Sequence, residues 1–274
     1  MPRTTALGSA VGRAARALRR GVSAGRHLPD ALYYRLAAAN HRHRAVATEK
    51  RVHDGSFRSY ELYDRHGNDW LLAALLDRCR DGQIVVDVGA NTGVYALSVA
   101  AEHPDATVVA IEPNPDTAAA LRANVEASGF EDRIATLELG LGEEDGTLPF
   151  HRSSYHELSS FNRFNAERWG ARVVGREEVP IRTLDGLIDR GEIPPPDHLK
   201  IDVEGFGPAV LRGARGTLRT HRPTVYLEPH ARTEGESDAT GGTADELEAL
   251  LGAASYDVIR AEEGWVGVPE GDRG

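Results

Sequence analysis

A short run at residues 86–95 combines an acid, a glycine-rich turn and the start of a helix. It opens with Asp87 at the end of an apolar segment, and Gly89, Asn91 and Gly93 follow. A buried strand that leads through such a turn into a helix is typical of a nucleotide-type pocket. Asn91 stands where the dinucleotide fingerprint has its second glycine, which lets a pyrophosphate approach the backbone. The run therefore favours a ligand without phosphates, most commonly S-adenosylmethionine, whose charged methionine end Asp87 is predicted to meet.

A second acid ends the next apolar segment, 107–111. Glu112 follows Gly93 by nineteen residues, at a position where a carboxylate accepts hydrogen bonds from both ribose hydroxyls. Either acid taken alone is equally compatible with a carboxylate that caps a helix. Because the two acids occur together with the glycine turn, the sequence predicts a cofactor site.

Three charged residues alternate along the segment 198–206. Strand alternation predicts that Lys200, Asp202 and Glu204 share one face, at a strand end of the kind where ligands bind in open α/β sheets. The chain has only two lysines, so a lysine here is expected to act as a compact donor that can change protonation. We interpret Asp202 as a catalytic base tuned by Lys200. The alternative is a structural ion pair that holds the strand end.

A histidine near the end of the following strand offers a second base. His230 lies two residues after Glu228 and is predicted to face the same strand end. These two residues, with Asp202 and Glu204, also suit an alternative in which Mg²⁺ or Mn²⁺ lowers the pKa of a hydroxyl. No tight ligand motif is present, so no metal is predicted.

The elements around these residues alternate between strand and helix. Strands are predicted at 84–88, 107–112, 134–139, 198–203, 223–228, 256–260 and 265–268. Helices are predicted at 30–39, at 69–78 with Asn68 as the N-cap, from about 93, and at 115–128, 183–189, 206–213 and 245–251. This order predicts an α/β fold with a seven-stranded, mostly parallel sheet, helices on both faces and a hairpin-like final pair of strands.

Two regions lie outside this alternation. Residues 1–66 are predicted to form a basic N-terminal arm and a helical extension, and residues 67–274 the main domain. Within that domain, 147–182 is interpreted as an insertion over the cofactor pocket. Its aromatic residues and histidines form either a substrate wall or a small satellite core: Phe150, His151, Tyr155, His156, Phe161, Phe164 and Trp169.

Motifs along the chain resemble the FkbM-type methyltransferase family, whose members use S-adenosylmethionine and mostly methylate hydroxyl oxygens. Two residues depart from the family pattern, namely Gly207, where Glu is usual, and Gly140, where Ala is usual. The matching pieces are VDVGANTGVYAL at 86–97, IEPNP at 111–115, LGEEDGT at 141–147, VPIRTLDGLI at 179–188, LKIDVEGFGPAVLRGA at 199–214 and PTVYLEPH at 223–230.

The resemblance implies a class I, Rossmann-like methyltransferase fold and assigns roles to residues. Glu112 is expected to hold the ribose, and the turn at Gly142 and Glu143 to border the adenine. Asp202 and Glu204 are expected to face the transferred methyl group. The methionine end is expected to contact Asp87, Gly89, Asn91 and Gly93.

The sequence leaves several functions open. We expect O-methylation of a hydroxyl on a sugar, glycan or small metabolite, because a positioned base at Asp202 suits a weakly nucleophilic hydroxyl. A carboxyl group of a uronic-acid-type sugar needs no base, so ester formation is an alternative. A non-catalytic binding module built on a cofactor fold is another, whereas Asn91 argues against a nicotinamide dehydrogenase.

Charge and composition limit which partners and which compartment we expect for the protein. The net charge is -10, but residues 1–50 carry ten basic and two acidic residues, so the rest of the chain is strongly acidic. An acidic body argues against nucleic-acid binding, and with thirty arginines it suggests a salt-adapted protein. One cysteine, Cys79, excludes an intramolecular disulfide. The absence of a long apolar segment predicts a cytoplasmic protein, with weak contact of the basic arm at the inner membrane surface.

Overall fold

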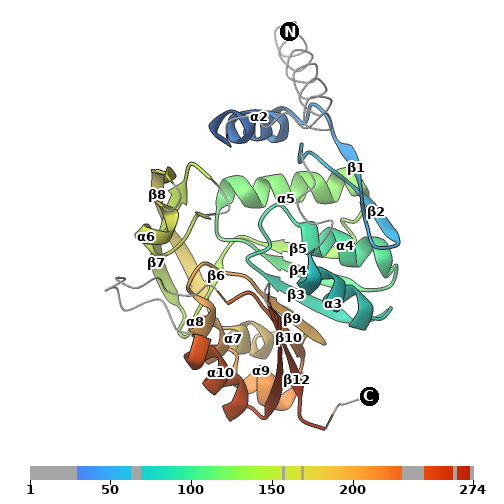
Figure 1. The fold of residues 1–274 in the computed structure, drawn as a ribbon, viewed down its shortest axis with the longest axis vertical. Coiled ribbons are helices and arrows are strands. Elements are labelled where there is room, and N and C mark those ends of the chain that lie inside the picture. The colour runs from blue at the N-terminus through green and yellow to red at the C-terminus, as the bar shows by residue number, and fades with distance from the viewer. Residues whose placement is uncertain are drawn as a thin grey trace, which may run out of the picture.

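The computed structural model describes residues 30–62, 69–155, 158–167, 170–229, 244–261 and 264–271. Its centre is a seven-stranded sheet with the strand order β11-β12-β10-β9-β3-β4-β5 (Figure 1). In chain order the strands are β3 (Ile84–Val88), β4 (Thr107–Ile111), β5 (Ile134–Leu137), β9 (His198–Ile201), β10 (Thr224–Leu227), β11 (Tyr256–Arg260) and β12 (Trp265–Pro269). Only β12 runs antiparallel to its neighbours, which confirms the predicted mostly parallel sheet with a paired end.

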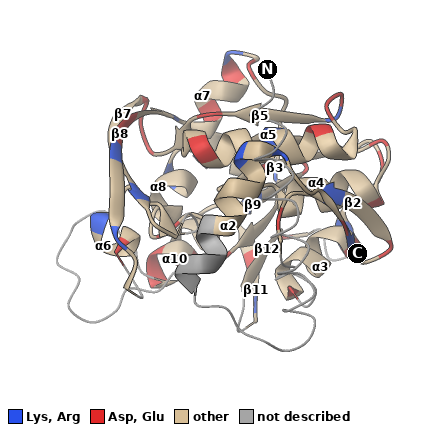
Figure 2. Cartoon of the chain, turned by 90° about the horizontal axis from the view of Figure 1, so that it is seen from above, with Lys and Arg blue, Asp and Glu red and all other residues tan. Residues whose placement is uncertain are grey.

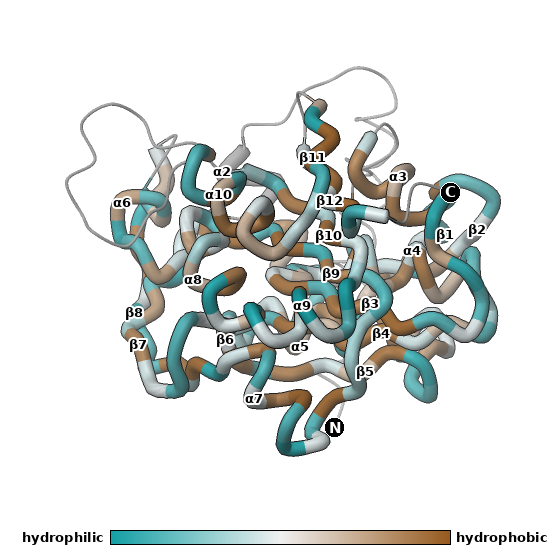
Figure 3. The backbone as a smooth tube through the Cα atoms, turned by 90° about the horizontal axis from the view of Figure 1, so that it is seen from below, coloured by the Kyte–Doolittle hydropathy of each residue, from teal (hydrophilic) through white to brown (hydrophobic). Residues whose placement is uncertain are grey.

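Each face of this sheet is covered by helices because its central strands are apolar on both sides. The successive residues Val85 and Val86 are both fully buried, and each belongs to a different hydrophobic cluster. One cluster packs under α3 (Trp70–Arg78), α4 (Val94–Glu102) and α5 (Pro115–Ser128). The other packs under α7 (Leu184–Asp189), α8 (Gly207–Arg212), α9 (Arg215–Thr220) and α10 (Ala244–Ala253). In Figure 3, where the tube is coloured by residue hydropathy, the hydrophobic residues of the central strands lie between these layers.

The predicted insertion is a small sheet of its own. Strands β7 (Gly146–Ser153) and β8 (Val173–Arg182) form a long antiparallel hairpin, and β6 (Gly140–Leu141) pairs with the other edge of β8. The short helix α6 (Arg163–Ala166) lies between the two hairpin strands in the chain. Figure 1 places this unit beside the end of the sheet at which α5 begins. The insertion therefore stands next to the carboxyl ends of the parallel strands.

The N-terminal extension contains a hairpin that the sequence did not predict. Helix α2 (Asp30–His43) is followed by β1 (Thr48–Val52) and β2 (Gly55–Ser59), which pair antiparallel. The hairpin is joined to α5 by hydrogen bonds from the backbone N–H of Tyr60 to Asn124 and from that of Arg58 to Ser128. Alternating exposure along β2 explains the strand, because Gly55, Phe57 and Ser59 face inward.

One local prediction is wrong. The cap of α3 is Asp69, whose side chain accepts a hydrogen bond from the N–H of Leu72, and not Asn68, which lies outside the described residues. The helix predicted at 206–213 is α8, and after a turn at Gly213 and Ala214 a second short helix, α9, follows that was not predicted. No helix in the described part of the chain is both long and apolar enough to cross a membrane.

Candidate active site

The glycine turn after β3 has a backbone geometry that side chains do not tolerate. Gly89 has a φ of 75°, and a Cβ there would lie 1.9 Å from the carbonyl oxygen of Asp202. Gly93 has a φ of 94°, and a Cβ there would lie 2.2 Å from the side chain of Leu121. Both glycines are therefore required by the packing of the chain itself. The turn places the backbone of Gly89 directly against Asp202, which follows β9, and the backbone N–H of Asn91 against Glu112, which follows β4.

Glu112 follows β4 and is held by two backbone donors. Its Oε2 accepts a hydrogen bond of 2.9 Å from the N–H of Asn91, and its Oε1 one of 2.9 Å from the N–H of Asn114. The side chain is almost completely buried. Burial raises the pKa of Glu112 to about 7, although the two backbone hydrogen bonds lower it. Each oxygen keeps a lone pair for a further donor, which is what two ribose hydroxyls supply.

Lys200 forms a buried ion pair with Asp87, across the neighbouring strands β9 and β3. The Nζ of Lys200 lies 2.9 Å from Oδ1 of Asp87 and donates to the carbonyl of Gly89 at 3.0 Å. It also lies 3.7 Å from Oδ2 of Asp202 and 4.8 Å from the ring centre of Tyr95. Burial works against the charged amine, but Asp87 and Asp202 outweigh it, and the pKa of Lys200 is raised. Lys200 therefore stays cationic and fixes the ends of both strands.

Tyr95 is a member of this network that the sequence analysis did not single out. Its hydroxyl lies 2.9 Å from both carboxylate oxygens of Asp69, the cap of α3. Burial and the neighbouring charge of Asp69 raise the pKa of Tyr95, so the hydroxyl remains a donor. The only sequence signal for this role was the aromatic residue just after Gly93.

One cavity brings five of the eleven predicted site residues together. It is lined by Gly89, Asn91 and Glu112 from the predicted cofactor half of the site and by Asp202 and Glu204 from its predicted acceptor half. Strand β9 ends at Ile201, so simple alternation does not reach Asp202 or Glu204. They line the same cavity because the turn that follows the strand folds back, with a positive φ at Gly205.

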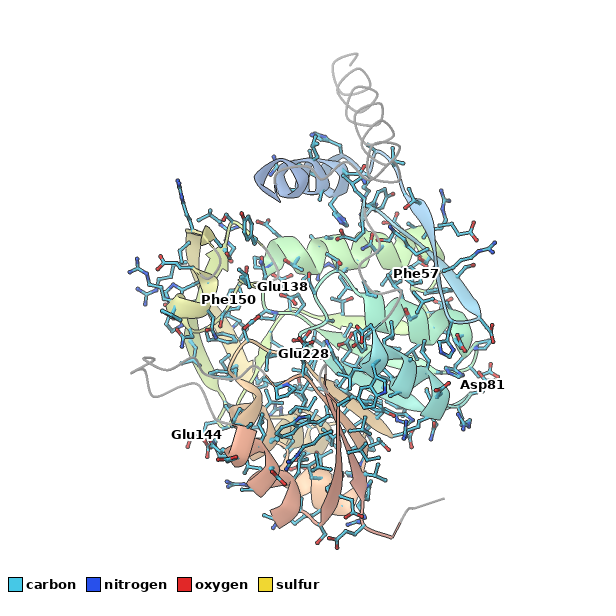
Figure 4. The ribbon with its side chains drawn as sticks, in the orientation of Figure 1. Phe57, Asp81, Glu138, Glu144, Phe150 and Glu228 are labelled. Atoms are coloured by element: carbon cyan, nitrogen blue, oxygen red, sulfur yellow. The ribbon has the colours of Figure 1, made fainter. Side chains whose placement is uncertain are left out.

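The insertion forms the opposite wall of this cavity. Phe150, Ser159, Ser160 and Phe161 line it there, and Phe206 lines it from the start of α8. Figure 4 labels Phe150 on the insertion and Glu228 directly after β10, at the strand ends. Two of the aromatic residues of 147–182 therefore line the cavity, while their predicted contact with a substrate stays a prediction.

The remaining aromatic residues of the insertion do not share this position. Phe164 is 54% exposed, and His156 and Trp169 lie outside the described residues. Two polar residues of the insertion bind the acceptor-side loop, since Ser160 and Asn165 both donate to the carbonyl of Glu204 at 3.1 Å. No sequence signal pointed to these two contacts.

Other predicted site residues lie away from the cavity lining. The carboxylate of Glu143 pairs with Arg212 of α8 at 2.6 Å, and Gly142 packs against Phe206 and Ile181. Their predicted contact with an adenine ring stays a prediction. His230, the second candidate base, lies outside the described residues. Across the described ranges, no three His, Cys, Asp or Glu side chains gather in a metal-binding cluster.

The donors and acceptors of this cavity fit S-adenosylmethionine. Asp87 is completely buried and is not part of the cavity lining, but its Oδ2 accepts no hydrogen bond from the described residues and so keeps acceptor capacity for a charged amino group. Glu112 has acceptor capacity for ribose hydroxyls, and the lining between them contains the backbone of the glycine turn.

Comparison with known proteins agrees with this geometry. Residues 87–258 match the profile of the methyltransferase FkbM domain. The chain is 50% identical over 218 residues to the 31-O-demethyl-FK506 methyltransferase FkbM of Streptomyces tacrolimicus, covering 68% of this chain and 80% of that protein. It is 29% identical over 174 residues to the hexuronic acid methyltransferase AglP of Haloferax volcanii, covering 63% of this chain and 66% of that one.

A solved structure also resembles this chain. The crystal structure of a methyltransferase FkbM from Methylobacillus flagellatus superposes with a TM-score of 0.48 at 17% identity, covering 97% of this chain and 59% of that one. The chain thus spans slightly less than two thirds of the Haloferax protein and of this crystallised chain.

Proposed function

The chain belongs to the FkbM family of S-adenosylmethionine-dependent methyltransferases, and we propose that it methylates an uncharged hydroxyl on a sugar, glycan or small metabolite. The observation that carries this proposal is that Glu112 and Asp202 line the same cavity. Glu112 offers a site for the ribose of the cofactor, and Asp202 offers a base at the adjacent strand end.

The residues divide the work of an in-line displacement. When bound, the cofactor supplies an electrophilic methyl group. Asp202, whose side chain is 34% exposed, accepts the proton of the acceptor hydroxyl as the oxygen attacks. Lys200, whose Nζ lies 3.7 Å from Oδ2 of Asp202, pairs with this carboxylate and holds it in place. Asp87, paired with Lys200, meets the amino group of the methionine end and orients the cofactor for transfer.

The charge of the cavity selects between hydroxyl and carboxyl acceptors. Its described lining contains the carboxyl groups of Glu112, Asp202 and Glu204 but no Lys, Arg or His. Lys200, which lies beside Asp202, already pairs with Asp87 and Asp202. A second carboxylate brought beside Asp202 meets repulsion that a neutral hydroxyl avoids. This supports O-methylation of a hydroxyl over ester formation on a uronic acid.

The experiment that tests this function compares neutral and acidic acceptors. Methyl transfer from labelled S-adenosylmethionine is measured with methyl glycosides, matched methyl glucuronides and polyol macrolides, and calorimetry follows S-adenosylhomocysteine and NAD. We expect binding of S-adenosylhomocysteine but not of NAD, and transfer to hydroxyls of neutral acceptors. Base-labile methyl esters formed only on the glucuronides would establish the carboxyl alternative. Cofactor binding without transfer to any acceptor class would favour a binding module.

We also propose that the protein works in the cytoplasm, with weak attraction of its N-terminal arm to anionic lipid. The arm is strongly basic in an otherwise acidic chain, which suits a surface that carries negative charge. The arm lies largely outside the described residues, so this proposal depends on the sequence. Co-sedimentation with vesicles containing phosphatidylglycerol tests it. Binding whose strength does not fall as ionic strength rises would contradict it.

A further inference from the structure

A second cavity, which we call the extension cleft, lies where three parts of the fold meet. Helix α2 of the N-terminal extension forms one side, the first half of α5 another, and the end of β7 with the start of β8 the third. Figure 1 shows α2 above α5, with the insertion beside the start of α5. The cleft has a volume of about 420 Å³. Small-molecule sites measure roughly 300–1,000 Å³, so the cleft has room for a ligand as it stands.

The extension cleft exists because the facing residues of its two helices are small. The alanines that line it from α2 and α5 are Ala37, Ala38, Ala119, Ala120 and Ala123. The extension is attached to α5 farther along the helix. The N–H of Tyr60 donates to Asn124 at 2.9 Å, and Arg44 pairs with Glu126 at 2.5 Å. These contacts fix the extension toward the end of α5, and the alanines leave space beside its beginning.

Two threonine hydroxyls at this cleft have no hydrogen-bond partner among the described residues. Thr92 of the glycine turn and Thr117 of the first turn of α5 both line the cleft, and they are only 7% and 5% exposed. Polar side chains buried to this degree are normally hydrogen-bonded. Each hydroxyl can donate one hydrogen bond and accept others, so the two threonines suit a ligand that itself carries hydroxyl groups.

The charge of the extension cleft is opposite to that of the catalytic cavity. Its described lining contains Arg42, Arg44 and Arg152 but only one acid, Asp116. Arg152 pairs with Asp116 at 2.6 Å and Arg44 with Glu126, whereas Arg42 has no ion pair with a described residue. A guanidinium group has five N–H donors, so the paired arginines also keep donors for a further anion. The cleft therefore favours a negatively charged group, in a chain whose main domain is acidic.

We propose that the extension cleft is a second ligand site, which binds a sugar or a similar polyol that carries a carboxylate or a phosphate. The threonine hydroxyls exchange hydrogen bonds with the hydroxyls of the ligand, and the guanidinium groups bind its anion. One layer of residues separates this site from the catalytic cavity. Asn114 lines the cleft and donates from Nδ2 to Oγ of Ser159 at 3.3 Å, and Ser159 lines the catalytic cavity. The inference goes beyond the proposed methyl transfer and does not depend on it.

The test titrates four ligands into the native chain by ligand-observed NMR: glucuronic acid, glucose 6-phosphate, methyl glucoside and inorganic phosphate. The tighter of the two sugar acids should bind at least about tenfold more strongly than methyl glucoside, the scale of one charge-assisted hydrogen bond. It should also bind more strongly than inorganic phosphate, and the two acids together show whether a carboxylate or a phosphate is preferred. If neither acid binds more strongly than methyl glucoside or inorganic phosphate, the inference is wrong.

Substitutions in the cleft locate the site on the chain. Arg42→Gln and Thr117→Val should each weaken the preferred acid, Arg42→Gln by about tenfold or more. Ala38→Leu fills the cleft from an exposed position and should weaken the same ligand. Arg51→Gln is the matched control, because Arg51 belongs to the same extension, is 82% exposed and does not line the cleft.

Binding of S-adenosylhomocysteine separates this inference from the proposed function. Its affinity should be unchanged in all four variants, since none of the substituted residues lines the catalytic cavity. Native affinity for the sugar acid in both Arg42→Gln and Ala38→Leu would overturn the second site, as would an equal loss in Arg51→Gln. A native chain that binds the sugar acid but not S-adenosylhomocysteine would instead overturn the proposed function. Melting temperatures confirm that each variant compared is folded.

Discussion

At the scale of single residues, the site depends on carboxyl groups whose surroundings differ. Glu112 is buried and accepts two backbone hydrogen bonds, whereas Asp202 is partly exposed and lies beside Lys200. Burial raises the pKa of Glu112 to about 7, and Lys200 gives Asp202 a cationic neighbour. These environments suit Glu112 for holding hydroxyl groups and Asp202 for accepting a proton during turnover.

Cofactor affinity should depend on pH through Glu112. Its pKa of about 7 lies above the ordinary value, so the carboxylate that accepts ribose hydroxyls is complete only above that pH. Affinity for S-adenosylhomocysteine should be constant above about pH 8 and fall as the pH drops through 7, by up to about tenfold per pH unit. Calorimetry between pH 5.5 and 8.5 measures this. Glu112→Gln should bind more weakly at pH 8 and show a flat profile, and a flat native profile would contradict the assignment.

Turnover should depend on the ionised side chain of Asp202. Asp202→Asn keeps the shape of the residue but removes the base, so the rate should fall by roughly a hundredfold or more while S-adenosylhomocysteine binding persists. Single-turnover rates with an acceptor identified above provide the measurement, and Glu138→Gln, at an exposed acid that pairs with Arg122 after β5, is the control. Loss of activity with a chelator would point to metal binding. If the variant unfolds more easily but each folded molecule keeps its rate, Asp202 acts only as an ion-pair partner.

At the scale of elements, the ends of neighbouring parallel strands carry the site, and contacts between loops set its shape. The turn after β3 and the turn after β9 touch at Gly89, where the carbonyl of Asp202 occupies the space of a side chain. The cofactor half and the acceptor half of the cavity are therefore held at a fixed separation by main-chain packing.

A pair of glycine substitutions tests that contact. Gly82 and Gly89 both have positive φ values, 81° and 75°, but a Cβ at Gly82 meets nothing within 4 Å. Gly82→Ala should cost only the strain of the left-handed backbone, about 1–2 kcal/mol of unfolding free energy. Gly89→Ala adds a clash with Asp202 and should cost several kcal/mol or prevent folding. Urea unfolding compares the two, and similar losses would show that the turns do not determine the site geometry.

At the scale of the whole molecule, charge is distributed unevenly along the chain and over the surface. The chain carries a net charge of -10 although its first fifty residues are basic. Figure 2 colours acidic positions red on the outer helices, among them α5, α7 and α10, with basic positions in blue between them. Repulsion among these exposed acids opposes folding and is screened by salt.

Added salt should therefore stabilise the protein. Between 0.05 and 1 M KCl the melting temperature should rise by about 2–4 °C, which corresponds to roughly 1 kcal/mol for a domain of this size. Scanning calorimetry at fixed pH measures the change, and an equal concentration series with choline chloride separates screening from specific ion binding. A melting temperature that falls with salt would mean that surface ion pairs outweigh the repulsion.

The sequence alone determined the sheet, its helices and the two halves of the site. Apolar runs, strand alternation and the glycine turn are local patterns, and they were enough to predict seven strands and the acids at the ends of β3 and β4. The match of motifs was enough to predict the cofactor class. Residues close in sequence, such as Lys200 and Asp202, were correctly predicted to lie together.

Tertiary structure alone decided how these residues are supported. The reason for glycine at Gly89 is a carbonyl more than a hundred residues away, and the reason at Gly140 is a ring from the insertion. The hairpin of the N-terminal extension and the contacts of Ser160 with the acceptor-side loop likewise join distant parts of the chain. Such contacts depend on which surfaces meet after folding, and periodicity along the chain carries no information about that.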